Sequence, residues 1–104
     1  MFTVAVIGCG RIANHAHLPS LSTIEGVRVK YACDIIEEKA VAAKEKFPII
    51  ENVITDYKEA LSDPEVDVVY VLTPNFAHYT VTMDALRAGK HVFCEKPITV
   101  SYAL

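Results

Sequence analysis

The sequence has no long hydrophobic run and no excess of basic residues, and each absence excludes a class of protein. No apolar stretch approaches the roughly 20 residues of a membrane-spanning helix, so we expect no membrane partner. Lys and Arg number 10 against 13 Asp and Glu, a net charge of −3. A nucleic-acid-binding surface normally shows a basic patch, so we expect no nucleic-acid partner. The N-terminus shows neither a basic leader nor a cleavage site, which predicts a cytoplasmic protein without a signal peptide.

Cysteine is scarce as well. The chain holds Cys9, Cys33 and Cys94, an odd number without a C-x-x-C pair, which fits neither a disulfide framework nor a zinc ribbon. Cys9 and Cys33 would end neighbouring strands, so a metal or redox role stays an alternative to the commoner role of small buried hydrophobes. We expect the commoner role and no metal site.

What is present is a composition typical of a folded domain, with 52% hydrophobic and 22% charged residues. Apolar segments alternate with amphipathic ones. Strands are predicted at residues 2–7, 27–33, 52–54, 66–72 and 91–94, and helices at residues 11–24, 36–47, 57–61, 77–88 and from 101 onward. This alternation predicts a parallel sheet covered on both faces. Right-handed crossovers make it a doubly wound α/β fold, in which ligands bind beyond the carboxyl ends of the strands.

The first strand runs directly into Gly8-Cys9-Gly10-Arg11-Ile12-Ala13, a G-x-G-x-x-A turn before a helix. In a dinucleotide-binding βα unit, Gly8 allows the tight turn and Gly10 lets a pyrophosphate approach the backbone, while Ala13 lets the helix pack closely on the strand. The phosphates would then lie at the positive end of the helix. Arg11 would either reach toward a phosphate or point to solvent. The motif by itself is weak, and its place between strand and helix strengthens it.

Asp34 follows Ala13 by about 20 residues, at the end of the second predicted strand. A carboxylate there accepts hydrogen bonds from both ribose hydroxyls of an adenosine and repels a 2′-phosphate, which favours NAD over NADP. Ile35 supports NAD, because an NADP site usually places a polar or cationic group nearby. The alternative role for Asp34 is a helix cap or a turn residue.

Two further segments follow strand ends. Thr73, Pro74 and Asn75 would form the floor under the nicotinamide ribose, with His78 one helical turn from Asn75 on the same face. A helix cap at Asn75 and a packing role for His78 are the alternatives.

Glu95-Lys96-Pro97 ends the fifth predicted strand. Lys96 could stabilise negative charge as a hydroxyl proton leaves, or orient a substrate carbonyl. The Lys96–Pro97 peptide could be cis. The alternative is a polar turn with a solvated lysine.

The segments GCGRIA, Asp34, TPNFAH and EKP together resemble the N-terminal domain of the Gfo/Idh/MocA oxidoreductases, which include glucose–fructose oxidoreductase and inositol dehydrogenase. The motifs keep the family's order and spacing over the whole chain, and EKP is the most specific of them. The resemblance implies a Rossmann domain that binds NAD, or less favourably NADP, and hydride transfer on a sugar, cyclitol or related polyol. It also implies that Lys96 is the catalytic lysine, that Asp34 binds the ribose, and that the other cofactor-binding positions are Gly8, Gly10, Arg11, Ile12, Ala13, Thr73, Pro74, Asn75, His78 and Glu95.

Members of that family continue into a second α/β domain that carries the substrate pocket, catalytic partners of the lysine and the usual oligomer interface. We therefore expect residues 1–104 to be a dinucleotide-binding domain, incomplete at its C-terminus, from a protein that forms homo-oligomers at full length. We expect negligible turnover from this chain alone. The alternatives are a nucleotide-binding module without chemistry and an interaction remnant.

Overall fold

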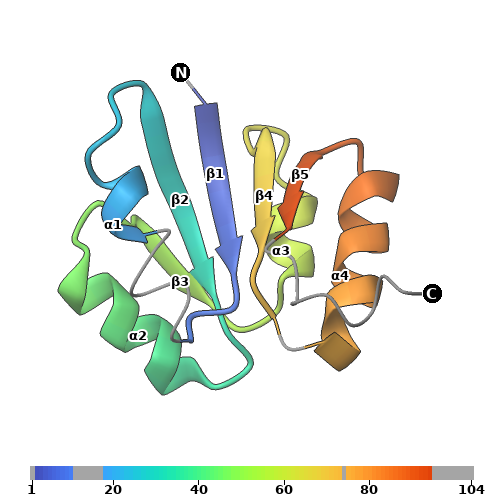
Figure 1. Ribbon diagram of the computed structural model, residues 1–104, viewed down its shortest axis with the longest axis horizontal. Helices are drawn as coiled ribbons and strands as arrows, with labels where there is room; N and C mark the ends of the chain where they lie inside the picture. The colour runs from blue at the N-terminus through green and yellow to red at the C-terminus, as the bar shows by residue number, and fades with distance from the viewer. Residues whose placement is uncertain (1, 11–17, 74, 95–104) are drawn as a thin grey trace.

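The computed structural model describes residues 2–10, 18–73 and 75–94 and arranges them around one parallel sheet (Figure 1). Its strands are β1 (Phe2–Ile7), β2 (Val27–Cys33), β3 (Asn52–Ile54), β4 (Val68–Val71) and β5 (His91–Cys94). Its helices are α1 (Leu18–Leu21), α2 (Glu37–Lys46), α3 (Lys58–Leu61) and α4 (Asn75–Arg87). The five strands run in the order β3-β2-β1-β4-β5. The predicted doubly wound α/β fold is confirmed.

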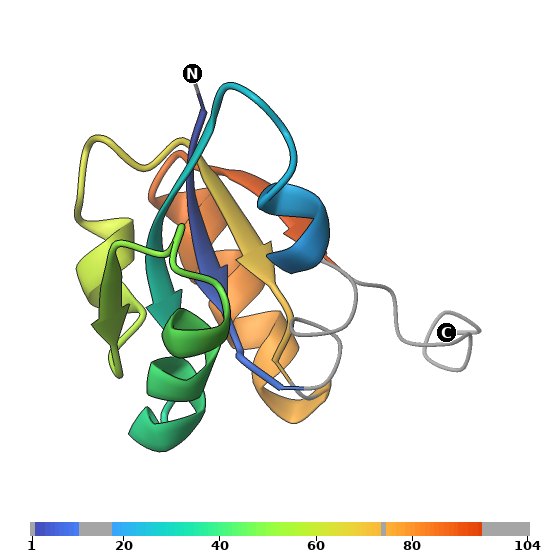
Figure 2. The same cartoon turned by 90° about the vertical axis from the view of Figure 1, so that its left-hand side faces the viewer.

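Each face of the sheet packs against its own pair of helices. Val4 and Val6 of β1 lie in one buried cluster with residues of α1 and α2. Ala5 and Ile7 lie in a second buried cluster with residues of α3 and α4. Figure 2 shows α1 and α2 in front of the sheet and α4 behind it. Successive side chains of a strand point to opposite faces, so a central strand covered on both sides is apolar along almost its whole length.

The order in which strands are added to the sheet reverses between β1 and β4. From β1 the chain winds outward through β2 and β3, then crosses to β4 and β5 on the other side of β1. Because all the strands are parallel, their carboxyl ends lie along one edge of the sheet. In open α/β sheets the ligand crevice lies outside such a switch point.

Several predicted boundaries need correction. Helix α1 ends at Leu21 and not at Ile24; the hydroxyl of Ser22 donates to the carbonyl of Leu18, and Ile24 is exposed. A serine that bonds back to the preceding turn competes with helix continuation. The start of that predicted helix lies in residues 11–17, outside the described part of the chain.

Helix α4 begins at Asn75 and not at Ala77, so the backbone of Asn75 belongs to the first turn of the helix. Strand β4 is shorter than predicted. Helix α4 was predicted to reach residue 88 and ends at Arg87; Gly89 follows with a φ of +80°, a conformation that favours glycine after a helix.

Strand β2 contains an irregularity that the sequence pattern did not reveal. Val4 pairs with Val29 and Ala5 pairs with Tyr31, so Lys30 is an extra residue in β2. The Lys30 ammonium lies 2.6 Å from a carboxylate oxygen of Asp63, and the hydroxyl of Tyr31 donates to the same carboxylate over 2.7 Å. Asp63 lies in the α3–β4 connection, before β4 begins, and so at the end of β4 opposite its carboxyl end. Within the described ranges, no helix is long and apolar enough to cross a membrane.

Candidate functional site at the carboxyl ends of the strands

A cavity of about 120 Å³ lies beyond the carboxyl ends of β1, β2 and β4. Drug-sized ligands occupy pockets of roughly 300–1,000 Å³, so this cavity accommodates one part of a larger ligand. It draws residues from four connections, and its lining is Ile7, Gly8, Cys33, Asp34, Ile35, Thr55, Tyr57, Thr73, Ala77 and Val81. The predicted site residues Gly8, Asp34 and Thr73 are therefore brought together.

Gly8 forms the turn at the end of β1 and meets the end of β4 at close range. Its φ is +102°, and its N–H donates to the carbonyl of Cys33 over 2.7 Å. A Cβ at this position would lie 2.8 Å from the carbonyl carbon and oxygen of Leu72. The tight turn follows from the sequence pattern, whereas the approach to Leu72 does not, because it joins segments far apart in the chain.

Gly10 borders open space. A Cβ built there meets no heavy atom of the described residues within 4 Å, so the backbone at this point is sterically accessible. Arg11, Ile12 and Ala13, the remaining predicted residues of the turn, lie outside the described residues.

Asp34 links the glycine turn to the β2–α2 connection. One carboxylate oxygen accepts the N–H of Cys9 over 2.9 Å, and the other accepts the N–H of Ile36 over 2.9 Å. The second bond is the turn role that the sequence left as an alternative. An ionised carboxylate has about four acceptor positions, so the same side chain retains capacity for further donors.

Cys9 and Cys33 lie buried beside Asp34. The Cys9 thiol donates to the carbonyl of Cys33 over 3.4 Å. Burial, reinforced by the negative charge of Asp34, raises the pKa of each thiol to about 12. Since the thiolate is the reactive and metal-binding form, these side chains have the character of buried hydrophobes. Among the described residues, no group of three or more His, Cys, Asp or Glu side chains is placed to hold a metal ion.

Thr73, just before α4, and His78, within α4, each have a polar side-chain atom without a hydrogen-bond partner among the described residues. Thr73 Oγ1 and His78 Nε2 are buried and form no hydrogen bond with the described residues. Buried polar side-chain atoms in proteins are mostly hydrogen-bonded, so both atoms are suited to a ligand or a water molecule. Pro74 lies outside the described residues, and Asn75 is described only through its backbone.

Sequence reasoning missed the wall that follows β3. Thr55 and Tyr57 line the cavity, and the hydroxyl of Tyr57 donates to Asp84 Oδ2 of α4 over 2.5 Å. This hydrogen bond, together with burial, raises the pKa of Tyr57 to about 12. The rule that ligands bind at strand ends could have found these residues, had it been applied to β3 as well as to its neighbours.

The remaining predicted residues follow β5. At its carboxyl end, the sulfur of Cys94 lies 3.5 Å from Thr82 Oγ1 of α4. Glu95, Lys96 and Pro97 come next and lie outside the described residues, so the catalytic role of Lys96 stays a prediction.

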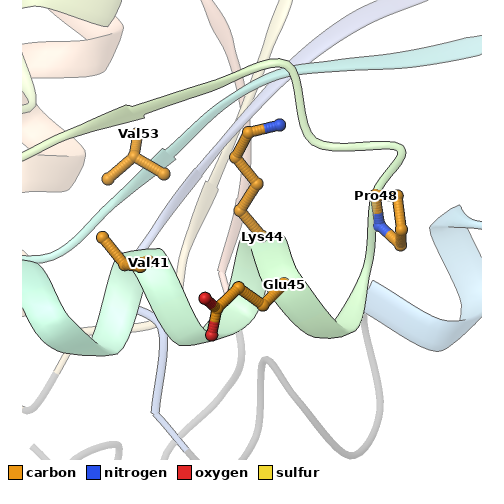
Figure 3. A pocket seen from close by; sticks show the side chains of 5 residues that line it. All are labelled: Val41, Lys44, Glu45, Pro48 and Val53. Atoms are coloured by element: carbon orange, nitrogen blue, oxygen red, sulfur yellow. The ribbon is translucent and has the colours of Figure 1, made fainter.

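A second hollow runs between α2 and β3, and Figure 3 shows its five lining side chains, Val41, Lys44, Glu45, Pro48 and Val53. Its volume is about 450 Å³, but the ammonium of Lys44 is engaged by the carbonyl of Ile50 over 2.9 Å. None of these residues carries a predicted role. The cavity at the carboxyl ends is therefore the candidate site.

Comparison with known proteins gives concordant matches. The model of the oxidoreductase family GFO_IDH_MocA, described as an NAD-binding Rossmann fold, matches residues 2–103. The inositol 2-dehydrogenase of Salmonella typhimurium is 40% identical over 99 residues, which are 94% of this chain and 29% of that enzyme. The 1,5-anhydro-D-fructose reductase of Ensifer adhaerens is 36% identical over 92% of this chain and 28% of its own length.

Solved structures agree. A 3-ketoreductase from Actinomadura kijaniata, crystallised with NADP and TDP-benzene, matches 94% of this chain and 30% of its own with 38% identity and a TM-score of 0.83. A scyllo-inositol dehydrogenase from Lactobacillus casei matches 94% of this chain and 29% of its own with 28% identity and a TM-score of 0.82. The chain thus spans less than a third of the length of these relatives.

Proposed function

Because the chain belongs to the GFO_IDH_MocA family of oxidoreductases, we propose that it is the NAD-binding part of a dehydrogenase that acts on a sugar, cyclitol or related polyol. The observation that carries the proposal is the position of Asp34, whose carboxylate borders the cavity at the switch point of the sheet. The polyol substrate is supported by relatives named as inositol dehydrogenases and as an anhydrofructose reductase. The chain spans 29% of the first of these relatives. We therefore propose this activity and substrate class, and assembly into homo-oligomers, for a longer protein that contains the chain.

The adenosine end of the cofactor would bind at Asp34 and Ile35. The acceptor capacity that remains on Asp34 suits the two ribose hydroxyls. Ile35 is 85% exposed, an apolar surface on which a flat base can pack. A 2′-phosphate would instead meet the carboxylate of Asp34 with the apolar Ile35 beside it. This supports NAD over NADP, although the similar ketoreductase was crystallised with NADP.

The pyrophosphate would pass the accessible backbone at Gly10, with Arg11, Ile12 and Ala13 completing the turn. Thr73 Oγ1 and His78 Nε2 would find partners on the nicotinamide side, which fits their buried, unsatisfied state. When bound, a nicotinamide cofactor supplies the carbon that exchanges a hydride with the substrate. Pro74, Asn75 and Glu95 would border this half of the site.

Lys96 would stabilise the charge that develops on the substrate oxygen as its proton leaves. The residues that complete the catalytic group lie, by family resemblance, in a second domain. We therefore expect these 104 residues to bind nucleotide with negligible turnover. Robust polyol oxidation by the chain alone, followed as NADH absorbance, would contradict this expectation.

Calorimetric titration with NAD and NADP tests the cofactor assignment. We expect tighter binding of NAD, and we expect Asp34→Ala to weaken NAD binding roughly ten- to hundredfold, the effect of a lost hydrogen bond to a charged group. NADP binding should weaken less or improve, because the repulsion is removed.

Asp34 also accepts two backbone hydrogen bonds, so its loss could weaken binding through the turn alone. Asp67→Ala is the matched control, because the Asp67 carboxylate also accepts a backbone N–H from a distant residue, Thr3, and does not line the cavity. The informative quantity is the ratio of NAD to NADP affinity. A ratio unchanged in Asp34→Ala refutes the ribose role.

A further inference from the structure

We propose that Tyr57 is a positioning residue for the adenine end of the dinucleotide, held in place by its hydrogen bond to Asp84. This inference rests on the proposed function, since it concerns the same cavity. It adds a residue from the β3–α3 connection, which neither the glycine turn nor the strand-end acid includes.

The Tyr57–Asp84 bond joins two walls of the cavity. Tyr57 directly precedes α3 and Asp84 belongs to α4, and their hydrogen bond measures 2.5 Å. Thr55 and Tyr57 line the cavity on one side, and Ala77 and Val81 of α4 line another. Helices α3 and α4 cover the same face of the sheet (Figure 1). The bond therefore holds the wall after β3 at a set distance from α4.

The bond persists at neutral pH. The pKa of Tyr57 is raised to about 12, so the phenol keeps the proton that it donates. The side chain of Asp84 is 27% exposed and its other carboxylate oxygen lies 3.8 Å from Arg87, so water can solvate this carboxylate if the phenol is removed. Replacing Tyr57 by Phe consequently tests the bond without stranding a buried charge.

Preorganisation is the physical effect of the bond. A tyrosine ring fixed in the free protein needs no ordering when a base enters the cavity. Without its anchor, the ring must be immobilised on binding, which weakens affinity roughly three- to tenfold. The loss of affinity should affect ligands that contain the adenine, whereas ligands that contain only the nicotinamide should bind unchanged.

The experiment measures dissociation constants of ADP-ribose and nicotinamide mononucleotide by calorimetry, with the 104-residue chain and its variants. Tyr57→Phe should weaken ADP-ribose binding roughly three- to tenfold and leave nicotinamide mononucleotide binding unchanged. Asp84→Asn keeps a carbonyl oxygen that accepts the phenol proton, so it should bind ADP-ribose like the wild type, whereas Asp84→Ala should resemble Tyr57→Phe.

Tyr31→Phe is the matched control. Tyr31 donates an equivalent hydrogen bond to Asp63 over 2.7 Å, away from the cavity, so its loss reproduces a general effect on the fold alone. An unchanged ADP-ribose affinity in Tyr57→Phe overturns the inference. So does an equal loss of affinity for ADP-ribose and nicotinamide mononucleotide in this variant, or an equal loss of ADP-ribose affinity in Tyr31→Phe. If the wild type binds neither ADP-ribose nor NAD, the proposed function fails together with it; NAD binding with an unaffected Tyr57→Phe refutes the inference alone.

Discussion

Replacing Gly8 by Ala should destabilise the fold through two separate effects. The backbone φ of Gly8 is +102°, and a side chain in left-handed conformations costs roughly 1–2 kcal/mol. The added Cβ would also lie 2.8 Å from the carbonyl group of Leu72 and 3.0 Å from the nitrogen of Thr73. These are backbone atoms at the end of a central strand, which cannot rotate away. Overpacking of this kind costs about 1–3 kcal/mol, so the free energy of unfolding should fall by about 2–5 kcal/mol in total.

The glycines of this chain separate the two effects. Gly89 has a similarly positive φ of +80°, but its Cβ would meet none of the described residues within 4 Å, so Gly89→Ala should lose only the conformational part. Gly10 has no positive φ, and a Cβ there meets no described residue within 4 Å, so Gly10→Ala should leave stability nearly unchanged. In that variant a methyl group should instead hinder NAD binding.

Urea unfolding followed by circular dichroism measures these differences through the linear dependence of unfolding free energy on urea concentration. A loss of about 2–5 kcal/mol is a large part of the roughly 5–15 kcal/mol that stabilises a typical domain, so Gly8→Ala should unfold at clearly lower urea. An equal loss of stability in Gly8→Ala and Gly89→Ala would show that Gly8 does not approach Leu72 closely enough to exclude a Cβ.

Two further predictions concern stability. The Lys30 ammonium and two hydrogen bonds, from Glu65 N–H and Tyr31, hold the pKa of Asp63 well below its usual range. A carboxyl group whose pKa is lower in the folded state stabilises the fold at pH values above its unfolded pKa of about 3.9. This stabilisation is lost as the pH falls through the folded-state pKa. Asp63→Asn should therefore flatten the acid side of a stability–pH profile, and an unaltered profile would contradict the pairing with Lys30. Leu18 is fully buried, so Leu18→Ala should lower the unfolding free energy by about 2–5 kcal/mol, whereas the half-exposed Leu86→Ala should change it by less than about 0.5 kcal/mol in a parallel urea titration.

The sequence was sufficient for the fold class and for much of the element order. Strands β1, β2, β3 and β5 have the predicted bounds, because apolar runs bounded by turn residues are local signals. The family could also be identified from the sequence, since the glycine turn and the strand-end motifs keep the family's order and spacing along the chain. The predicted bounds were wrong at the end of α1, at the start of α4 and at both ends of β4.

Local sequence patterns were enough to place Gly8, Asp34 and Thr73 each after a strand, and a parallel sheet brings such residues to one edge. The contacts that these and neighbouring residues form could be established only from the folded chain. Asp34 receives the N–H of Cys9, Gly8 packs against Leu72, and Tyr57 bonds to Asp84. Each of these contacts joins residues distant in the chain, at a distance set by how the strands and helices pack, and no local pattern encodes that distance.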